Sequence, residues 1–258
     1  VRGTLYSMPK AVLFDLDDTL AESFKPPERG MIDRLIALLD KAPVAILTAA
    51  GFPRVETEFL DFLILSPRID RFFVFPSSAS ECYIHRDGAW RIEYSLSFTD
   101  DERSAVKKAI ADSIAEVGPL DTYNYTSAII DRDSQVAFAA LGLQATVEDK
   151  NAWDPNQQKR RRLKAAIESR IPQFEVLIGG KTTIDITKKG VDKAYGVRWL
   201  AHKIGCDPSE MLFVGDALYE GGNDAVVIQT GIQTTPVANP GDTASVIDTL
   251  LERYEETA

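Results

Sequence analysis

The sequence predicts an α/β protein: a Rossmann-like, doubly wound parallel sheet interrupted by an inserted α+β module. Short apolar runs alternate with segments whose apolar residues have helical spacing, which is the pattern of a parallel α/β sheet. In the middle of the chain this alternation gives way to paired strands with turn signals. The alternation then returns from Gly190 onward.

The first third of the chain alternates strand and helix. Apolar runs at 11–14, 44–47 and 72–75 are predicted to be buried strands, and helical spacing predicts helices at 31–39 and 55–65. The first run ends abruptly in acidic residues, as a buried parallel strand does at its carboxyl end. These strands therefore predict one parallel sheet.

The middle of the chain has a different pattern. Asp87-Gly88 is a hairpin turn signal, and Thr99 with Glu102 has the spacing of a capping box. The elements expected here are a hairpin at 83–92, a helix at 99–117, a hairpin at 128–138, a basic helix at 157–171, and strands at 174–178 and 182–186. Hairpins combined with helices indicate an α+β module.

The closing segment resumes the first pattern. The elements expected are a helix at 191–204, strands at 211–214 and 225–228, and a helix at 243–254. The simplest organisation is an α/β core formed by residues 1–82 and 187–258. Residues 83–186 then form an inserted α+β module.

Composition narrows the range of partners. The 258 residues include 29 basic and 39 acidic side chains, a net charge of −10, which disfavours nucleic acid or an acidic membrane as a partner. Cys82 and Cys206 lie far apart and suggest neither a disulfide framework nor a zinc site. The chain has no apolar stretch of membrane-spanning length and no signal-peptide pattern, so we expect a cytoplasmic protein.

The first candidate site is the acidic strand end Asp15-Leu16-Asp17. Residues two apart on an extended segment share a face, so Asp15 and Asp17 point into one site. Close carboxylates repel, and a divalent cation such as Mg2+ relieves the repulsion. An acidic turn capping the next element explains the pattern equally well when the cluster is taken alone.

The second candidate site is the strand end at Asp216, followed by a glycine-rich turn with Asn223 and Asp224. Asp216 would complete the metal site, and Asn223 or Asp224 would support it. The alternative is a glycine-rich loop ending in a helix cap. The presence of two acidic strand ends in one sheet makes that alternative less attractive.

Two further segments are weaker signals when taken alone. Lys193 follows Lys188 and Lys189 near a helix start, and a fixed ammonium stabilises the charge of a phosphoryl transition state. Thr48 and Ala49 follow a strand, where a hydroxyl and backbone N–H groups hold phosphate. Lysines are usually solvated, and a strand-end threonine is common.

Together and in this order, the four segments resemble the haloacid dehalogenase superfamily of aspartate-nucleophile phosphotransferases. The resemblance implies that Asp15 is the nucleophile, Asp17 the general acid/base, Thr48 a phosphate ligand and Lys193 the motif lysine. It also implies that Mg2+ is held by the carboxylates of Asp15 and Asp216 and by the backbone carbonyl of Asp17.

The position of the insertion resembles the subclass IIB proteins, which carry a large α/β cap. Phe73-Val74-Phe75-Pro76 and the segment around Ile178-Gly179-Gly180 are similar to eukaryotic-type phosphomannomutases and related sugar-phosphate phosphatases. The cap residues that this resemblance implies for substrate binding are Arg132, Lys181, Thr183 and Asp185. Cap-to-cap homodimers are also implied as a possibility.

The chain departs from the mutases at two places. A second cap arginine is replaced by Leu143, and Lys181 or the basic run 159–162 is the candidate substitute. The Gly-Arg that commonly follows the second-motif hydroxyl is Ala49-Ala50 here. A mutase binds a second phosphate in its cap, which calls for paired cationic donors.

Three functions are compatible with these residues. The first is a phosphatase acting on a small phosphorylated substrate, most simply a sugar phosphate, through an aspartyl-phosphate intermediate. The alternative is a phosphomannomutase or phosphohexomutase, in which the sugar takes the phosphoryl group back. A non-catalytic sugar-phosphate sensor on the same scaffold is the third.

Overall fold

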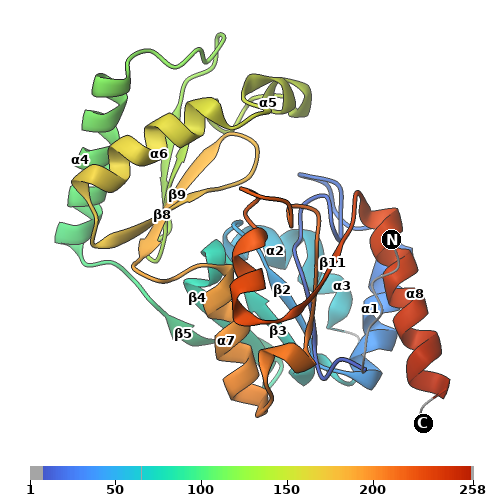
Figure 1. Ribbon diagram of the computed structural model, residues 1–258. Coiled ribbons are helices and arrows are strands. Elements are labelled where there is room, and N and C mark those ends of the chain that lie inside the picture. The colour runs from blue at the N-terminus through green and yellow to red at the C-terminus, as the bar shows by residue number, and fades with distance from the viewer. Residues whose placement is uncertain (1–7, 65, 257–258) are drawn as a thin grey trace. The chain divides into compact units, whose positions relative to one another are not determined.

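The computed structural model describes residues 8–64 and 66–256, and the chain forms two compact units (Figure 1). The first unit comprises Val1–Tyr94 and Lys193–Ala258, and the second comprises Ser95–Asp192. No helix in the described ranges has the length and apolar content that a membrane span requires.

The first unit contains a seven-stranded sheet in the order β11-β10-β1-β2-β3-β4-β5. The five strands from β11 to β3 are parallel, and β4 runs antiparallel to β3. The strands are β1 Val12–Phe14, β2 Val44–Leu47, β3 Phe72–Phe75, β4 Glu81–Arg86, β5 Ala89–Ser95, β10 Leu212–Gly215 and β11 Gln233–Pro236. The predicted α/β fold with a largely parallel sheet is confirmed.

Helices cover both faces of this sheet, because its parallel strands are apolar on both sides. The helices are α1 Arg29–Lys41, α2 Phe52–Val55, α3 Asp61–Leu63, α7 Lys193–Ile204 and α8 Pro240–Glu256, with a π-helical turn at Glu56–Leu60 between α2 and α3. Helices α1 and α8 lie side by side (Figure 1). Short 3-10 turns occur at Ile69–Arg71, Ser77–Ala79, Pro208–Glu210 and Ala225–Thr230.

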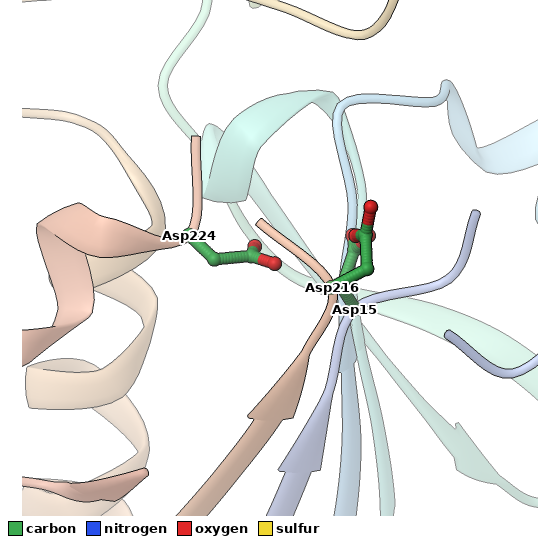
Figure 2. Close-up of side chains that lie close together, drawn as sticks. All are labelled: Asp15, Asp216 and Asp224. Carbon is green, nitrogen blue, oxygen red and sulfur yellow. The ribbon is translucent and has the colours of Figure 1, made fainter. Parts of the chain in front are cut away.

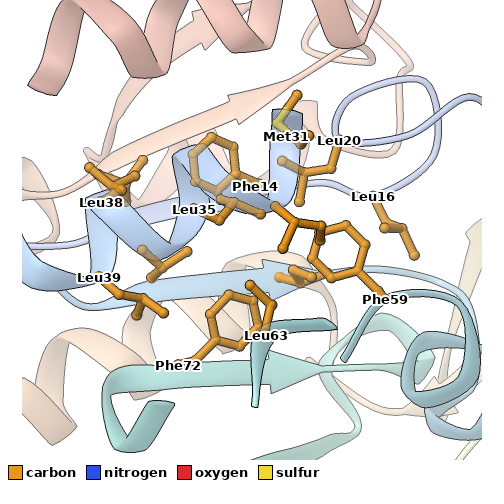
Figure 3. Close-up of a cluster of buried hydrophobic side chains, with 14 of the residues drawn as sticks. Phe14, Leu16, Leu20, Met31, Leu35, Leu38, Leu39, Phe59, Leu63 and Phe72 are labelled. Carbon is orange, nitrogen blue, oxygen red and sulfur yellow. The ribbon is translucent and has the colours of Figure 1, made fainter. Parts of the chain in front are cut away.

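Alternate residues of β1 enter two different cores. Phe14 packs with Leu35 and Leu39 of α1 in the larger cluster, which Figure 3 shows. Leu13 packs in a second cluster with Leu200 of α7. Since neighbouring strand residues point to opposite faces, β1 is fixed from both sides and the chain that follows it has a defined position.

The predicted hairpin at 83–92 forms, but its strands extend the core sheet. Asp87 and Gly88 in its turn both have positive φ, 51° and 74°. Strand β4 pairs with β3 through Phe73 and Ile84, so the first unit extends to Tyr94. The sequence analysis began the inserted module at residue 83, because a hairpin pattern does not reveal which sheet its strands join.

The predicted strand at 225–228 is wrong. Residues Ala225–Thr230 form a 3-10 turn, and the strand next to β10 is β11, at Gln233–Pro236. Asp224 lies at the carboxyl edge of the sheet, bonded to Ala217. A parallel neighbour of β10 must begin at the opposite edge, so the chain first has to cross back.

The second unit is an antiparallel sheet in the order β6-β7-β9-β8, packed against helices. Its elements are α4 Asp100–Val117, β6 Ala128–Asp131, β7 Val136–Ala139, α5 Val147–Trp153, α6 Gln158–Arg170, β8 Phe174–Ile178 and β9 Thr183–Lys188. Helix α5 was not predicted. The remaining elements of this unit match the sequence analysis to within a few residues, and α4 and α6 supply Ile110 and Leu163 to the core.

The capping box of α4 provides a test of local stability. The Thr99 hydroxyl accepts from the Glu102 N–H at 3.2 Å, and the Glu102 carboxylate accepts from the Thr99 N–H at 2.7 Å. We expect Thr99→Ala to lower the free energy of unfolding by about 1 kcal/mol in urea titrations. Thr99→Ser keeps the hydroxyl and should retain most of that stability. Equal losses in both variants would contradict this assignment.

Candidate active site

The ends of three neighbouring parallel strands bring the first groups of the site together. Phe14 of β1 is in register with Val214 of β10 and with Ile46 of β2. Asp15, Asp216 and Thr48 follow these strands, so they lie at the carboxyl edge of one sheet. This is the edge at which open α/β sheets bind ligands.

A buried lysine joins two of the acids. Lys193, the first residue of α7, places its Nζ 2.6 Å from Asp15 Oδ1 and 2.6 Å from Asp224 Oδ1. All three side chains are buried. Burial lowers the pKa of Lys193, but the two carboxylates raise it further, and the net change is upward. Lys193 is therefore a fixed ammonium in contact with the predicted nucleophile.

Asp15, Asp216 and Asp224 form a three-carboxylate cluster, with one oxygen from each lying within 4.8 Å of the others. Figure 2 shows Asp15 and Asp216 at the ends of adjacent strands and Asp224 on a separate loop. Burial and the two neighbouring carboxylates raise the pKa of Asp15, against the effect of Lys193. Ionisation of all three acids is therefore unfavourable without a further cation, and their hard oxygen donors fit Mg2+.

Glycine allows Asp224 to approach β10. A Cβ on Gly215 would lie 2.3 Å from Asp224 Oδ2, and one on Gly222 would lie 2.0 Å from the carbonyl oxygen of Ala217. Asp224 Oδ2 accepts from the Ala217 N–H at 3.1 Å. Asn223 is half-buried, and its side chain makes no hydrogen bond within the described ranges. The structure thus places Asp224, and not Asn223, in the acid cluster.

A threonine links the first acidic segment to the second. Thr19 is buried, and its hydroxyl accepts from the Asp216 N–H at 3.1 Å. The sequence analysis gave Thr19 no role. Its signal was a hydroxyl residue that closely follows an acidic strand end.

Thr48 and Ala49 lie on a loop that β3 and the turn after it hold in place. The Thr48 N–H donates to Phe75 at 3.0 Å, and the Thr48 hydroxyl accepts from the Ala50 N–H at 3.1 Å. Ser78 donates to the Thr48 carbonyl at 2.8 Å. Of the groups expected to hold phosphate, the Thr48 hydroxyl keeps a proton to donate, whereas its backbone N–H is committed to the sheet.

Asp17 lies outside the three-carboxylate cluster. Its two side-chain oxygens accept from Arg54 Nη1 and Nη2, at 2.9 and 2.7 Å. Its assignment to the metal rested on the backbone carbonyl, so the position of its carboxylate leaves that prediction untested. Arg54 was not among the predicted site residues, because nothing in its local sequence distinguishes it from a surface arginine.

The second unit contains another cluster of polar side chains, which includes Asp185. This side chain is buried in the middle of β9, and its Oδ2 has no hydrogen-bond partner in the described part of the chain. Burial raises the pKa of Asp185 to about 6, although Arg132 opposes the change. A Cβ on Gly179 would lie 2.2 Å from Thr183 Oγ1 and 2.3 Å from Asp185 Oδ2. The glycine therefore leaves both oxygens room, and Lys181 is exposed on the same loop.

One residue of the basic run 159–162 has a structural role. Arg160 is buried, and its Nε lies 3.0 Å from Asp154 Oδ2. The same guanidinium donates to the carbonyls of Gly179 and Gly180. Arg160 therefore holds the loop that carries Lys181.

Lys188 and Lys189, the lysines near the predicted motif, form ion pairs inside the second unit. The Lys188 Nζ lies 2.6 and 2.5 Å from the two carboxylate oxygens of Glu102, and Lys189 pairs with Glu175 at 3.2 Å. Of the three lysines in this stretch, Lys193 is the one that contacts the acids of the site.

Comparison with known proteins places the chain in a family. A model of eukaryotic phosphomannomutases matches residues 117–253, more than half of the chain. The chain belongs to the eukaryotic phosphomannomutase family. It is therefore an enzyme of the haloacid dehalogenase type, as the order of its motifs predicted, and the non-catalytic sensor is disfavoured.

Individual relatives agree with this family assignment. The phosphomannomutase of Spinacia oleracea is 25% identical over 218 residues, covering 82% of this chain and 83% of the relative. The Plasmodium falciparum IMP-nucleotidase superposes with a TM-score of 0.72 at 15% identity, covering 96% of this chain and 70% of that one. A haloacid dehalogenase-like hydrolase from Bacteroides thetaiotaomicron gives 0.61 at 14% identity, covering 94% and 99%. At these identities the structures support the fold alone.

The Arg160 bridge of this phosphomannomutase-family chain yields a stability prediction. Arg160→Met leaves the buried Asp154 carboxylate without its cation, so we expect the free energy of unfolding to fall by about 3 kcal/mol. Arg161→Met, one position along on the exposed side of α6, should change it by less than about 0.5 kcal/mol. Urea titrations would measure both. Similar values for the two variants would refute the bridging role.

The buried Asp185 predicts a dependence of stability on pH. Its pKa is raised from 3.8 to about 6, so the unfolded chain ionises this group in a pH range where the folded chain still binds the proton. The free energy of unfolding therefore falls as pH rises through that window, by on the order of 3 kcal/mol from this group.

Asp185→Asn removes this loss. We expect the variant to match the parent near pH 4 and to be more stable at pH 7.5, with urea titrations at both values as the measurement. A variant that is less stable at pH 7.5 would show that the ionised carboxylate has a compensating partner.

Proposed function

We propose that this enzyme takes a phosphoryl group from a sugar phosphate onto Asp15 in an Mg2+-dependent reaction and then transfers it to water. The observation that carries the proposal is the contact of Lys193 with Asp15 beside two further carboxylates at the sheet edge. A buried ammonium and crowded hard oxygens suit phosphoryl transfer, because the transferred group carries its charge on its oxygens.

The proposed reaction has two steps. A carboxylate oxygen of Asp15 forms a bond to phosphorus while the bond to the sugar oxygen breaks, and Asp17 gives its proton to the departing alkoxide. Asp17 then takes a proton from water, which attacks phosphorus and releases Asp15 and inorganic phosphate. Lys193 holds Asp15 Oδ1 throughout and stabilises the charge that develops on the phosphoryl oxygens.

The resemblance assigns Mg2+ to the carboxylates of Asp15 and Asp216 and to the carbonyl of Asp17, and the acid cluster adds Asp224 as a candidate support. When bound, Mg2+ neutralises charge on the carboxylates and on the phosphoryl group. Asp224 also restrains Lys193, so the protein's own contribution is to keep the nucleophile and the ammonium in fixed positions.

We assign the binding of the sugar to the second unit, through Arg132, Lys181, Thr183 and Asp185. Asp185 Oδ2, which has no partner among the residues that the structure describes, is an acceptor that a sugar hydroxyl would satisfy, and satisfying it removes the cost of a buried polar atom. The exposed Lys181 provides a cation on the neighbouring loop. A homodimer and a cytoplasmic location remain predictions.

Family membership supports a second candidate, a phosphohexomutase. A mutase has to bind a second phosphate, which requires cationic donors in the cap. At the position where the resemblance implies a second arginine, Leu143 presents an apolar side chain that is 66% exposed. Arg132 shares its charge with Asp185 and its side chain bonds Gln135. These contacts favour the phosphatase.

The two candidates differ in the acceptor, and one assay separates them. Mannose 1-phosphate and a panel of other hexose phosphates are incubated with enzyme and Mg2+, and both free phosphate and the isomerised sugar phosphate are measured. We expect phosphate release without mannose 6-phosphate. Isomerisation without net phosphate release would establish the mutase instead.

Asp15→Asn provides the control for the nucleophile. An amide does not attack phosphorus, so activity should fall by at least about 1,000-fold while circular dichroism shows an unchanged fold. Chelation of Mg2+ by EDTA should have a comparable effect that added Mg2+ reverses. Turnover that survives Asp15→Asn would show that another group accepts the phosphoryl.

A further inference from the structure

Arg54 contacts the predicted general acid/base of the site. It stands in α2, and its Nη1 and Nη2 reach both oxygens of Asp17 at 2.9 and 2.7 Å. Such a two-point pair fixes the plane of the carboxylate as well as its position. Asp17 is the residue that donates and accepts protons in the proposed function.

Arg54 is itself restrained on two further sides. Its Nε donates to Glu58 Oε2 at 2.9 Å, on the π-helical turn that follows α2. Its Cζ lies 5.0 Å from the centroid of the Phe24 ring, within the range of a cation–π contact. The Phe24 N–H also donates to Asp17 Oδ1 at 3.3 Å. The guanidinium is thus fixed in its plane by Glu58 and on its face by Phe24.

We propose that Arg54 is a positioning residue for the general acid/base Asp17. The proposal rests on the proposed function, which makes Asp17 the proton donor and acceptor. Asp17 follows a strand on a loop and its side chain is 32% exposed, so the local chain alone does not select one rotamer. Proton transfer requires the carboxyl to be held near one geometry, and the fork of Arg54 supplies that constraint.

The same contacts argue against a direct role for Arg54 in binding substrate phosphate. Nε, Nη1 and Nη2 all have carboxylate partners, Glu58 for the first and Asp17 for the other two. A phosphate approaching the remaining N–H groups would be repelled by the negative charge of these two carboxylates. Arg54 therefore acts through Asp17.

The first experiment compares Arg54→Ala with a matched control. Arg34→Ala removes a similar arginine–aspartate fork, in which Arg34 binds Asp248 at 2.8 and 2.9 Å between α1 and α8. On the sugar phosphate identified by the panel, we expect Arg54→Ala to lower kcat by about 10- to 100-fold, with KM changed by less than about 3-fold. Arg34→Ala should leave both parameters unchanged.

Two rescues distinguish positioning from general destabilisation. Millimolar guanidinium should restore part of the kcat of Arg54→Ala, whereas an equal concentration of methylammonium should not, because only the planar fork matches both oxygens. Arg54→Lys should remain at least about 5-fold below the parent for the same reason. Arg54→Gln replaces Arg54→Ala if circular dichroism shows that the alanine variant does not fold.

The second experiment uses the leaving group. With p-nitrophenyl phosphate as the substrate, the leaving group p-nitrophenolate departs without a proton. Its release in a single turnover therefore needs no general acid. We expect Arg54→Ala to leave this rate within about 2-fold of the parent while it lowers the release of the sugar. In an Asp17→Ala background, replacing Arg54 should cost less than about 2-fold more in nitrophenol release.

Two results would overturn the positioning role. The first is that Arg54→Ala raises KM and leaves kcat unchanged. The second is that replacing Arg54 in the Asp17→Ala background lowers the rate equally for the sugar phosphate and for p-nitrophenyl phosphate. Either would place Arg54 on the substrate. If Asp17→Ala itself left sugar-phosphate turnover intact, the proposed function would fail. If Asp17→Ala impaired turnover and Arg54→Ala did not, the role of Arg54 alone would be lost.

Discussion

The interaction on which the site depends is the buried contact of Lys193 with Asp15 and Asp224. The cost of removing buried charges from water can exceed the gain from their attraction, so a buried ion pair is weak evidence for stability. It persists because both carboxylates are aimed at one ammonium by rigid elements. Asp216 adds a further negative charge at the same point. The excess charge is the physical reason that a divalent cation suits this site.

Backbone geometry builds the arrangement around that contact. Parallel register places Asp15 and Asp216 one strand apart, and the absence of a side chain at Gly215 lets Asp224 approach from a loop. On the other side of β1, the turn Ser77–Ala79 has φ of 51°, 58° and 64° at three consecutive non-glycine residues. Left-handed residues of this kind cost about 1–2 kcal/mol each, and here they direct the N–H groups of Ser77 and Ser78 to the carbonyls of Ala50 and Thr48.

The second unit follows the same physical logic with different groups. Asp185 is a buried carboxylate with one oxygen that no described residue bonds, and Arg160 is a buried cation that fixes the loop beside it. Arg160 limits the freedom of the backbone that carries Lys181. In each unit a buried cation is paired with a carboxylate, Lys193 with Asp15 and Arg160 with Asp154, and the pair also fixes the position of the neighbouring chain.

The sequence by itself predicted the parallel sheet and an inserted module, because apolar periodicity is a local feature. Acidic strand ends marked Asp15 and Asp216 as candidate site residues, and the resemblance of the four segments in their order added Lys193. Tertiary structure alone decided which sheet the hairpin at 81–95 joins, why residues 225–230 turn back before β11, and that Asp224 enters the acid cluster. It also decided that Arg54 reaches Asp17 across 37 positions of sequence. These outcomes depend on contacts between distant segments, and no periodicity or spacing within a segment records such contacts.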